Sequence, residues 1–155
     1  MDADNMQGHK ALRKGRFSQE NNMYHVTIVT YQRQPVFSSF ETASALARVL
    51  NSPAVLKTSS LSAWVIMPDH WHAIVQVGQH DSLSQIVGRI KAISTRVIHN
   101  KKMWEGNLWT KAFHDRALRS ENELLPLARY IVANPLRAGL VQRAGNYPFW
   151  NAVWV

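Results

Sequence analysis

The order of the expected elements, strand–helix–strand–strand–helix–strand–helix, predicts an α+β protein with a ferredoxin-like fold, which is a split βαβ arrangement. Two apolar segments rich in β-branched residues flank the turn Pro68-Asp69, and this pattern indicates an antiparallel hairpin. One stretch before the hairpin and one after it repeat their apolar residues at helical spacing. We therefore expect an antiparallel sheet with helices on one face, and the other face free for a site.

The first half of the chain supplies four of these elements. Residues 23–31 are mostly β-branched or aromatic and predict a strand, which Pro35 ends. Residues 37–50 place apolar side chains at helical spacing and predict an amphipathic helix. The hairpin strands are expected at residues 61–67 and 70–77.

The second half is expected to add a helix, a strand and a final helix. Asp81-Ser82 is a plausible cap for a helix that reaches about His99. Residues 112–118 are compatible with a fourth strand. Ser120 and Glu123 match a capping box for the last helix, with Pro126 either interrupting it or marking its first turn. This helix is expected to end near Asn134, because a proline follows.

Length and composition favour one globular domain over residues 17–155, preceded by a flexible basic arm at residues 1–16. The absence of cysteine excludes disulfides and thiolate metal sites. No apolar run is long enough to span a bilayer, and the first residues do not resemble a secretory signal. We expect a cytoplasmic protein that does not act at a membrane.

The formal net charge of +8 favours a polyanionic partner, since neutralised phosphates release counterions. Residues 89–143 hold eleven Lys and Arg against four Asp and Glu, so the excess is concentrated in the second half. A solvated basic surface is the alternative interpretation, and nucleic acid is the favoured partner.

Two histidines, His70 and His72, form the first candidate site. Side chains alternate between the faces of a strand, so both imidazoles are expected on one face, with Trp71 on the other. Two neutral imidazoles at this spacing can ligate one cation. The start of a strand just after a turn can hold them rigidly. The alternative is a pair of surface or hydrogen-bonded histidines that bind no metal.

Tyr130 is the second candidate. On a helix it shares a face with Asn134, four residues on, so a hydroxyl nucleophile and an amide oxygen can be presented together. The alternative is a half-buried packing residue. Among the other tyrosines, Tyr24 and Tyr31 are better explained by sheet packing, and Tyr147 lies in a tail that contains glycine and proline.

Several segments together resemble a known family. The segment WVIMPDHWHAIVQV is similar to the HUH motif region of single-tyrosine transposases, in which two histidines flank a hydrophobic residue. The segment RYIVANPLRAGLV resembles the one that carries their nucleophilic tyrosine. GRFSQENNMYHVTIVTYQRQPVF, SLSQIVGRIKAISTR and LWTKAFHDRALRSENEL resemble one branch, the bacterial REP-associated tyrosine transposases, and all five segments lie within residues 15–141.

This resemblance implies the HUH nuclease form of the ferredoxin-like fold, with a C-terminal tyrosine helix. It implies that His70 and His72 ligate Mg²⁺ or Mn²⁺, with Asn134 at the third position, where other branches place glutamine. Tyr130 would be the nucleophile of a transposase that cleaves and rejoins single-stranded DNA through a 5′-phosphotyrosine and a free 3′-hydroxyl.

The expected partner, also by resemblance, is a hairpin-forming palindrome of the REP kind with a short single-stranded guide at its foot. A monomer is expected rather than a dimer, close to the bacterial nucleoid. Trp104, Trp109 and Phe113 are candidates for stacking on bases, and Trp150 and Trp154 either cap the site or pack. The candidates for DNA backbone contacts are Lys14, Arg16, Arg89, Lys91, Arg96, Arg116 and Arg119.

Two other functions stay open at the level of sequence. One is a hairpin-DNA-binding protein that has lost cleavage. The other is a metal-dependent RNase or phosphohydrolase that uses water in place of the tyrosine.

Overall fold

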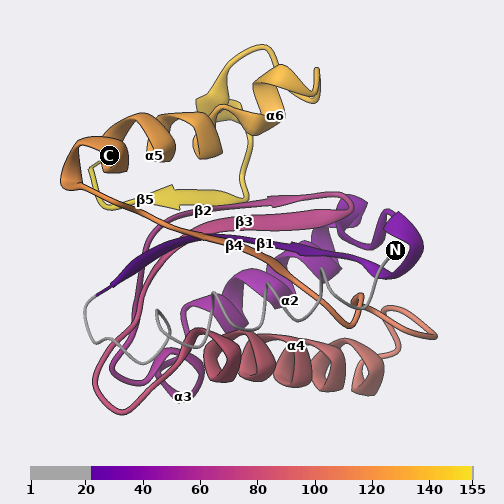
Figure 1. Cartoon of the computed structure of the whole chain (residues 1–155). Helices are drawn as coiled ribbons and strands as arrows, with labels where there is room; N and C mark the ends of the chain where they lie inside the picture. The colour runs from indigo at the N-terminus through magenta and orange to yellow at the C-terminus, as the bar shows by residue number, and fades with distance from the viewer. Residues whose placement is uncertain (1–21, 155) are drawn as a thin grey trace, which may run out of the picture.

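The computed structural model describes residues 22–154, so the predicted arm, with Lys14 and Arg16, and the predicted domain start at residue 17 lie outside the described residues. Five strands form one sheet in the order β4-β1-β3-β2-β5, and every pairing is antiparallel (Figure 1). The first four strands have the ferredoxin-like order, which confirms the predicted fold class. The strands are β1 Met23–Val29, β2 Ser60–Met67, β3 His70–Gln76, β4 His114–Ala117 and β5 Trp150–Ala152.

The helices divide between the two faces of the sheet. Helices α2 and α4 cover one face, and α5 lies over the opposite face (Figure 1). The sheet thus has a helix layer on one side and a separate tyrosine helix on the other, as expected. The α-helices are α2 Phe40–Leu50, α3 Pro53–Leu56, α4 Leu83–Asn100, α5 Leu124–Val132 and α6 Asn134–Arg137. Short 3-10 turns occupy Tyr31–Arg33, Val36–Ser38, Glu121–Glu123 and Ala144–Asn146.

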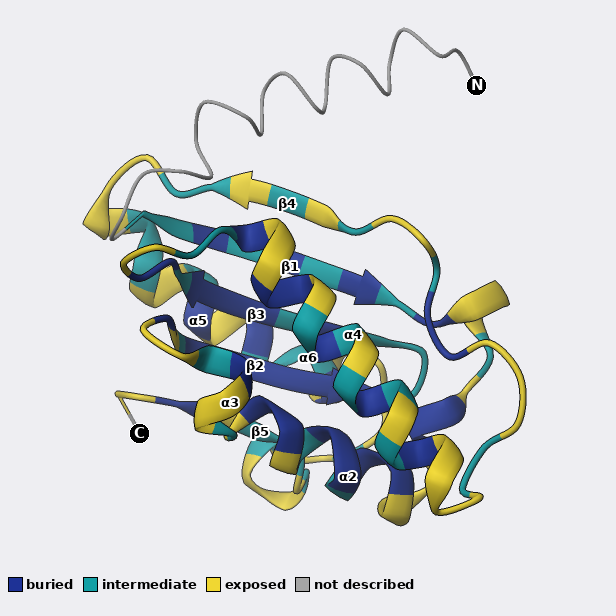
Figure 2. Ribbon diagram, turned by 90° about the horizontal axis from the view of Figure 1, so that it is seen from below, coloured by how far each residue is buried: buried dark blue, intermediate teal, exposed yellow. Residues whose placement is uncertain are grey.

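The main core lies between the sheet and the pair α2 and α4. Strand β1 buries every second side chain there, Tyr24, Val26 and Ile28, which leaves the intervening residues on the α5 face. Trp71 of β3 is fully buried in the same core. Figure 2, seen from the α2 and α4 side, shows the inner faces of both helices buried and their outer faces exposed.

A second, smaller core holds α5 against the sheet. Val65 and Met67 of β2 and Ile74 of β3 point towards α5, where Ile131 is fully buried. Ala152 of β5 completes this cluster from the sheet edge. Strand β5 was not predicted from the sequence, because three residues beside a Gly- and Pro-containing tail give no alternating pattern of useful length.

Two predicted helix starts have different outcomes. The Ser82 hydroxyl accepts a hydrogen bond from the backbone N–H of Gln85 at 3.2 Å, which confirms the cap of α4. The capping box at Ser120 is wrong, because that side chain makes no cap bond and the Glu123 carboxylate instead accepts from the Arg119 backbone N–H. Pro126 lies in the first turn of α5, where its missing N–H costs no helix bond. Within residues 22–154, no helix is both long and apolar enough to cross a membrane.

Candidate active site

The two histidines lie side by side on the sheet face that α5 covers. Trp71 between them is buried in the opposite core, so the predicted sharing of a face is confirmed. The centroids of the His70 and His72 rings are 4.6 Å apart, with the rings nearly perpendicular. Both side chains are half-buried. The protein can therefore hold one side of each imidazole ring while the other side meets a ligand.

Each imidazole has its Nδ1 engaged by a neighbouring side chain. The His70 Nδ1 lies 2.6 Å from a carboxylate oxygen of Asp69, and the His72 Nδ1 lies 2.9 Å from the Thr27 hydroxyl. The His25 Nε2 also approaches the His72 Nδ1, at 3.4 Å. An outer partner on one ring nitrogen orients an imidazole and leaves the other nitrogen for a ligand. The Nε2 atoms of His70 and His72 are the ones left over.

The surroundings keep His72 neutral. Burial, followed by the charges of His70, His25 and Arg137, lowers the pKa of His72 to about 3. Burial and then the charge of Arg116 lower the pKa of His25 in the same direction. Although burial opposes it, hydrogen bonds and charges from His70 and from Arg33 hold the pKa of Asp69 below its usual range. Near neutral pH the site thus holds an ionised Asp69 carboxylate and an uncharged His72 imidazole.

Tyr130 lies on the outer side of α5 and is 52% exposed. The Arg137 guanidinium carbon lies 3.8 Å from the centroid of the Tyr130 ring, and the Arg137 charge also acts on His72. Arg137 therefore contacts the tyrosine ring and lies within electrostatic range of His72. Asn134 is the first residue of α6 and is half-buried, so the predicted helix end near it is a short break between α5 and α6.

The other described tyrosines are poorer nucleophile candidates. Tyr24 is fully buried in the main core, as its place in a strand suggested. The Tyr147 hydroxyl donates to the Ile66 carbonyl, and burial raises the pKa of Tyr147 to about 12. Tyr31 is exposed but lies in the 3-10 turn after β1, outside the α5 layer. Tyr130 is the most exposed of the four.

Sequence reasoning missed the residues that support the site: Thr27, His25, Asp69 and Arg137. A signal existed for two of them, because His25 and Thr27 are the polar residues that alternate with buried ones in β1. Arg137 follows Tyr130 by seven residues, but the break between α5 and α6 means that helix spacing alone does not place it on the tyrosine. In the described part of the chain, no group of three or more His, Cys, Asp or Glu side chains is placed to hold a metal, so two histidines would need an amide or substrate oxygen beside them.

Two of the residues predicted to contact DNA, Arg89 and Lys91, form hydrogen bonds within the protein. The Arg89 guanidinium donates to both carboxylate oxygens of Asp81, at 3.0 and 2.6 Å, and to the Val55 carbonyl at 2.7 Å. The Lys91 Nζ donates to the Thr110 carbonyl at 2.7 Å, and burial lowers the pKa of this lysine. These bonds tie α4 to α3 and to the segment before β4, and contact of Arg89 and Lys91 with DNA stays a prediction.

The remaining basic candidates are exposed. Arg96 and Arg119 lie on the surface, and Arg116 donates to Glu123 at 2.9 Å while its side chain stays 52% exposed. The predicted stacking groups are less available: Trp109 is 8% exposed and its indole N–H donates to Ser94. Trp104 and Phe113 pack against the main core, and Trp150 packs against the second core.

A ferredoxin-like sheet that carries a histidine pair on one face, under a helix with an exposed tyrosine, defines the class of HUH-type single-tyrosine transposases. The chain belongs to the IS200-like transposase family, whose model matches residues 18–134. The predicted resemblance to its REP-associated branch is confirmed: the chain is 28% identical, over 90 residues, to the REP-associated tyrosine transposase of Escherichia coli K12. That match covers 57% of this chain, and the chain spans about half the length of the curated relatives it matches, 52% and 53%.

Solved structures share the fold. A REP-associated tyrosine transposase bound to a REP hairpin superposes with a TM-score of 0.72 at 22% identity, over 87% of this chain and 79% of that one. A bacterial tRNA(His) guanylyltransferase-like protein in complex with ATP gives a TM-score of 0.53 at 10% identity, over 95% and 73%. Because the same architecture serves different chemistries, the function must be argued from the site.

Proposed function

We propose that this chain cleaves and rejoins single-stranded DNA at hairpin-forming palindromes, with Tyr130 as nucleophile and a divalent cation held by His70 and His72. The observation that carries the proposal is the outer support of the histidine pair. Asp69 and Thr27 engage the two Nδ1 atoms, so both Nε2 atoms are left for one ligand.

The cation proposed for this site is Mg²⁺ or Mn²⁺. Neutral imidazoles ligate cations, and the low pKa of His72 keeps its ring neutral across the physiological range. Asn134 is the proposed third protein ligand and would supply an amide oxygen. Because these three ligands carry no charge, the full positive charge of the cation would face the DNA. When bound, the cation would draw charge from a non-bridging oxygen of the scissile phosphate and orient the phosphate for in-line attack.

Tyr130 would form a bond from its hydroxyl oxygen to the phosphorus, and the bond from phosphorus to the 3′-oxygen would break. The leaving 3′-oxygen gains the proton that the hydroxyl loses, so the products are a 5′-phosphotyrosine and a 3′-hydroxyl. A second 3′-hydroxyl can reverse the step and join two strands, since the phosphodiester energy is kept in the covalent intermediate. We assign Arg137 to the phosphate, because its guanidinium lies against the Tyr130 ring with its N–H groups unpaired by any described carboxylate.

The substrate class comes from the relatives and from charge. A fold neighbour binds a REP hairpin, and the chain carries a net charge of +8, so we propose hairpin DNA with a single-stranded foot as the partner. Exposed Arg116 and Arg119, at the α5 side of β4, are proposed backbone contacts for this DNA.

The test is an end-labelled hairpin DNA with single-stranded flanks, incubated with the protein and Mn²⁺ and separated on a denaturing gel. We expect a protein–DNA adduct that is lost in Tyr130→Phe and kept in Tyr31→Phe, a matched removal of another exposed hydroxyl. Hairpin binding without any adduct would support the binding-only alternative. Cleavage that survives in Tyr130→Phe would support hydrolysis by water and reject the tyrosine mechanism.

A further inference from the structure

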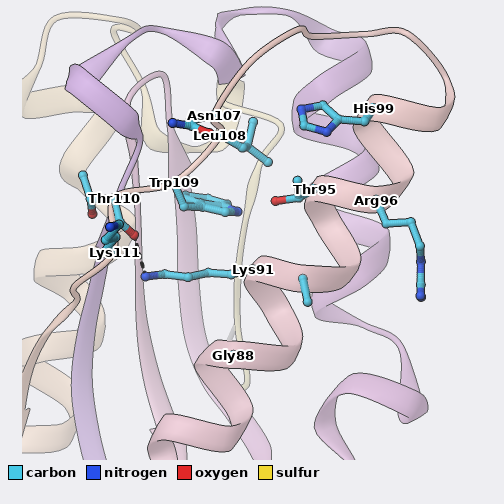
Figure 3. A pocket seen from close by; sticks show the side chains of 11 residues that line it. Gly88, Lys91, Thr95, Arg96, His99, Asn107, Leu108, Trp109, Thr110 and Lys111 are labelled. Carbon is cyan, nitrogen blue, oxygen red and sulfur yellow. Dashed lines mark hydrogen bonds between the residues drawn. The ribbon is translucent and has the colours of Figure 1, made fainter.

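A groove of about 530 Å³ lies on the helix-bearing side of the molecule, between α4 and residues 107–111 (Figure 3). Lys91 reaches across from α4 to the facing segment, where its Nζ donates to the Thr110 and Ala112 carbonyls at 2.7 and 3.1 Å. Trp109 lies beneath the groove and is bonded to Ser94 of α4. The groove is therefore held in shape by the protein's own bonds.

The rims of this groove are basic. Lys111 lies on the facing segment, and Arg96 belongs to the α4 side of the lining while its guanidinium extends into solvent, away from Lys91 (Figure 3). Both side chains are exposed, and neither takes part in an ion pair among the described residues. The described lining includes no carboxylate. This distribution of charge attracts an anion that runs along the groove.

Gly88 supplies an independent observation. It lies inside α4 and lines the groove, and a Cβ added there would meet no atom within 4 Å. A glycine weakens a helix interior relative to alanine, and no neighbouring group of the protein requires it here. A bare stretch of backbone does, however, let a bound molecule approach the helix closely.

A second hollow of about 330 Å³ shares Thr110 with the groove and continues to the end of β1. Its lining includes His114 and Arg33, and it too has no described carboxylate. Arg33 donates to Asp69 at 3.2 Å, and Asp69 in turn holds His70. The two hollows thus lead from the edge of the candidate active site to the α4 face.

The path between them turns around the end of the sheet, because the histidine pair lies on the α5 face and the groove on the α4 face (Figure 1). Duplex DNA is stiff, with a persistence length of about 150 base pairs, and does not follow such a turn over one protein domain. A single strand does. Since Trp109 is only 8% exposed, the groove offers little aromatic surface for stacking, and Arg96 and Lys111 provide its free cations.

We propose that this groove binds the phosphates of a single-stranded DNA segment that flanks the hairpin. The inference rests on the proposed function, which places that hairpin at the histidine pair. Lys91 to His99 spans about 12 Å of helix at 1.5 Å per residue. Recognition would be independent of sequence, because the contacts go to the backbone.

The test measures equilibrium binding of two labelled hairpins, one blunt and one with a single-stranded flank, across a series of salt concentrations. The test variant is Arg96→Gln with Lys111→Gln, and the matched control is Arg48→Gln with Lys57→Gln, which removes the same charge from exposed residues of α2 and the end of α3. Arg33 is left intact because it pairs with Asp69. Tyr130→Phe in every protein keeps the readout to binding alone.

We expect the flank to tighten binding by the parent protein and by the control, but not by the test variant. The salt slope for the flanked hairpin should fall by about 1.4 in the test variant, because each single-strand phosphate contact contributes about 0.7. Equal loss in test and control variants, or no loss in either, overturns the proposal. So does equal weakening of the blunt and flanked hairpins by the test variant, which would place the stem in the groove.

Gly88→Gln is a second variant that keeps the charge and fills the open backbone. We expect an unchanged or higher thermal midpoint and a smaller gain from the flank. A full gain from the flank in this variant would place the strand outside the groove and reject the proposal. These binding results do not depend on cleavage, so failure of the adduct assay and failure of this inference are separate outcomes.

Discussion

At the scale of single residues, the site depends on side chains that touch the histidines and the tyrosine rather than on those residues alone. Thr27 and Asp69 each contact one imidazole through Nδ1, and Arg137 covers the Tyr130 ring. None of the three belongs to the His-X-His or Tyr-X-X-X-Asn pattern. The residues that support the site therefore come from several elements of the fold and not from the two motifs alone.

Arg137 gives the first prediction. Arg137→Gln should slow formation of the Tyr130 adduct by about 10- to 100-fold, because the phosphate attacked by Tyr130 would lose a charged donor worth about 1.4 kcal/mol or more. Hairpin affinity should change little. The measurement is a single-turnover time course with the flanked hairpin and Mn²⁺. Arg129→Gln is the control, since Arg129 is an exposed neighbour on α5, whereas Arg137 is the described cation over the tyrosine ring. Equal rates in both variants would remove Arg137 from the reaction.

His72 gives the second prediction, which concerns stability against pH. Its pKa is about 3 in the folded protein and 6.5 ordinarily, so the unfolded chain takes up a proton that the folded protein refuses between these values. The stability linked to His72 is therefore complete above pH 6.5 and is lost as the pH falls towards 3. The loss is at most about 1.4 kcal/mol per pH unit.

Urea unfolding in EDTA at pH 7, 5.5 and 4 checks this slope. His72→Asn should unfold with a shallower dependence on pH than the parent protein. His80→Asn is the control, because His80 is exposed and its positive φ of 57° is a conformation that asparagine tolerates. A His72→Asn protein with the parent slope would contradict the assignment.

At the scale of elements, α4 shows how the same charge pattern can serve two purposes. Three residues of this helix carry the same positive charge: Arg89, Lys91 and Arg96. In the structure, Arg89 is bonded to Asp81 and Lys91 to Thr110, whereas Arg96 is exposed. The difference follows from the helix period, which directs the first two towards other segments of the chain and the third to solvent. Only tertiary neighbours decide which cation on a helix remains available for DNA.

Helix α5 illustrates a different dependence. Its sequence predicts a helix and places Tyr130 on it, but its position over the β2 side of the sheet is set by Ile131 and Ala128 packing on Val65 and Met67. The break at Ala133 and Asn134 then starts α6, which brings Arg137 back over the tyrosine. The proline at position 135 indicated a break but not the direction of the chain after it.

At the scale of the whole molecule, the sheet has two unequal cores, and β5 closes the edge beside the smaller one. Ala152→Asp should lower the free energy of unfolding by about 2 kcal/mol or more, because Ala152 is 4% exposed and a buried carboxylate there gains no partner from the apolar cluster. Val153→Asp is the control: Val153 is 69% exposed and should change stability by less than about 0.5 kcal/mol. Chemical denaturation measures both, and similar losses would mean that β5 does not seal this core.

The two faces of the sheet carry different candidate binding features. The α5 face carries the histidine pair and the tyrosine, and the α4 face carries the groove with Arg96 and Lys111. The end of β1, with Arg33 and Thr30 bonded to Asp69, joins the two faces. In the proposed function, a DNA strand that contacts both faces would pass this corner, whose lining includes Arg33 and His114.

The sequence by itself determined the strand and helix order, the shared face of His70 and His72, and the family, because these depend on periods of two and 3.6 residues and on local motifs. It also indicated Tyr130 ahead of the other tyrosines. Other features could be seen only in the tertiary structure. Thr27 and Asp69 orient the imidazoles, and Arg137 covers Tyr130. Arg89 and Lys91 are hydrogen-bonded within the protein, and β5 closes the sheet. Each of these depends on how the elements of the fold are placed relative to one another, which local sequence patterns do not specify.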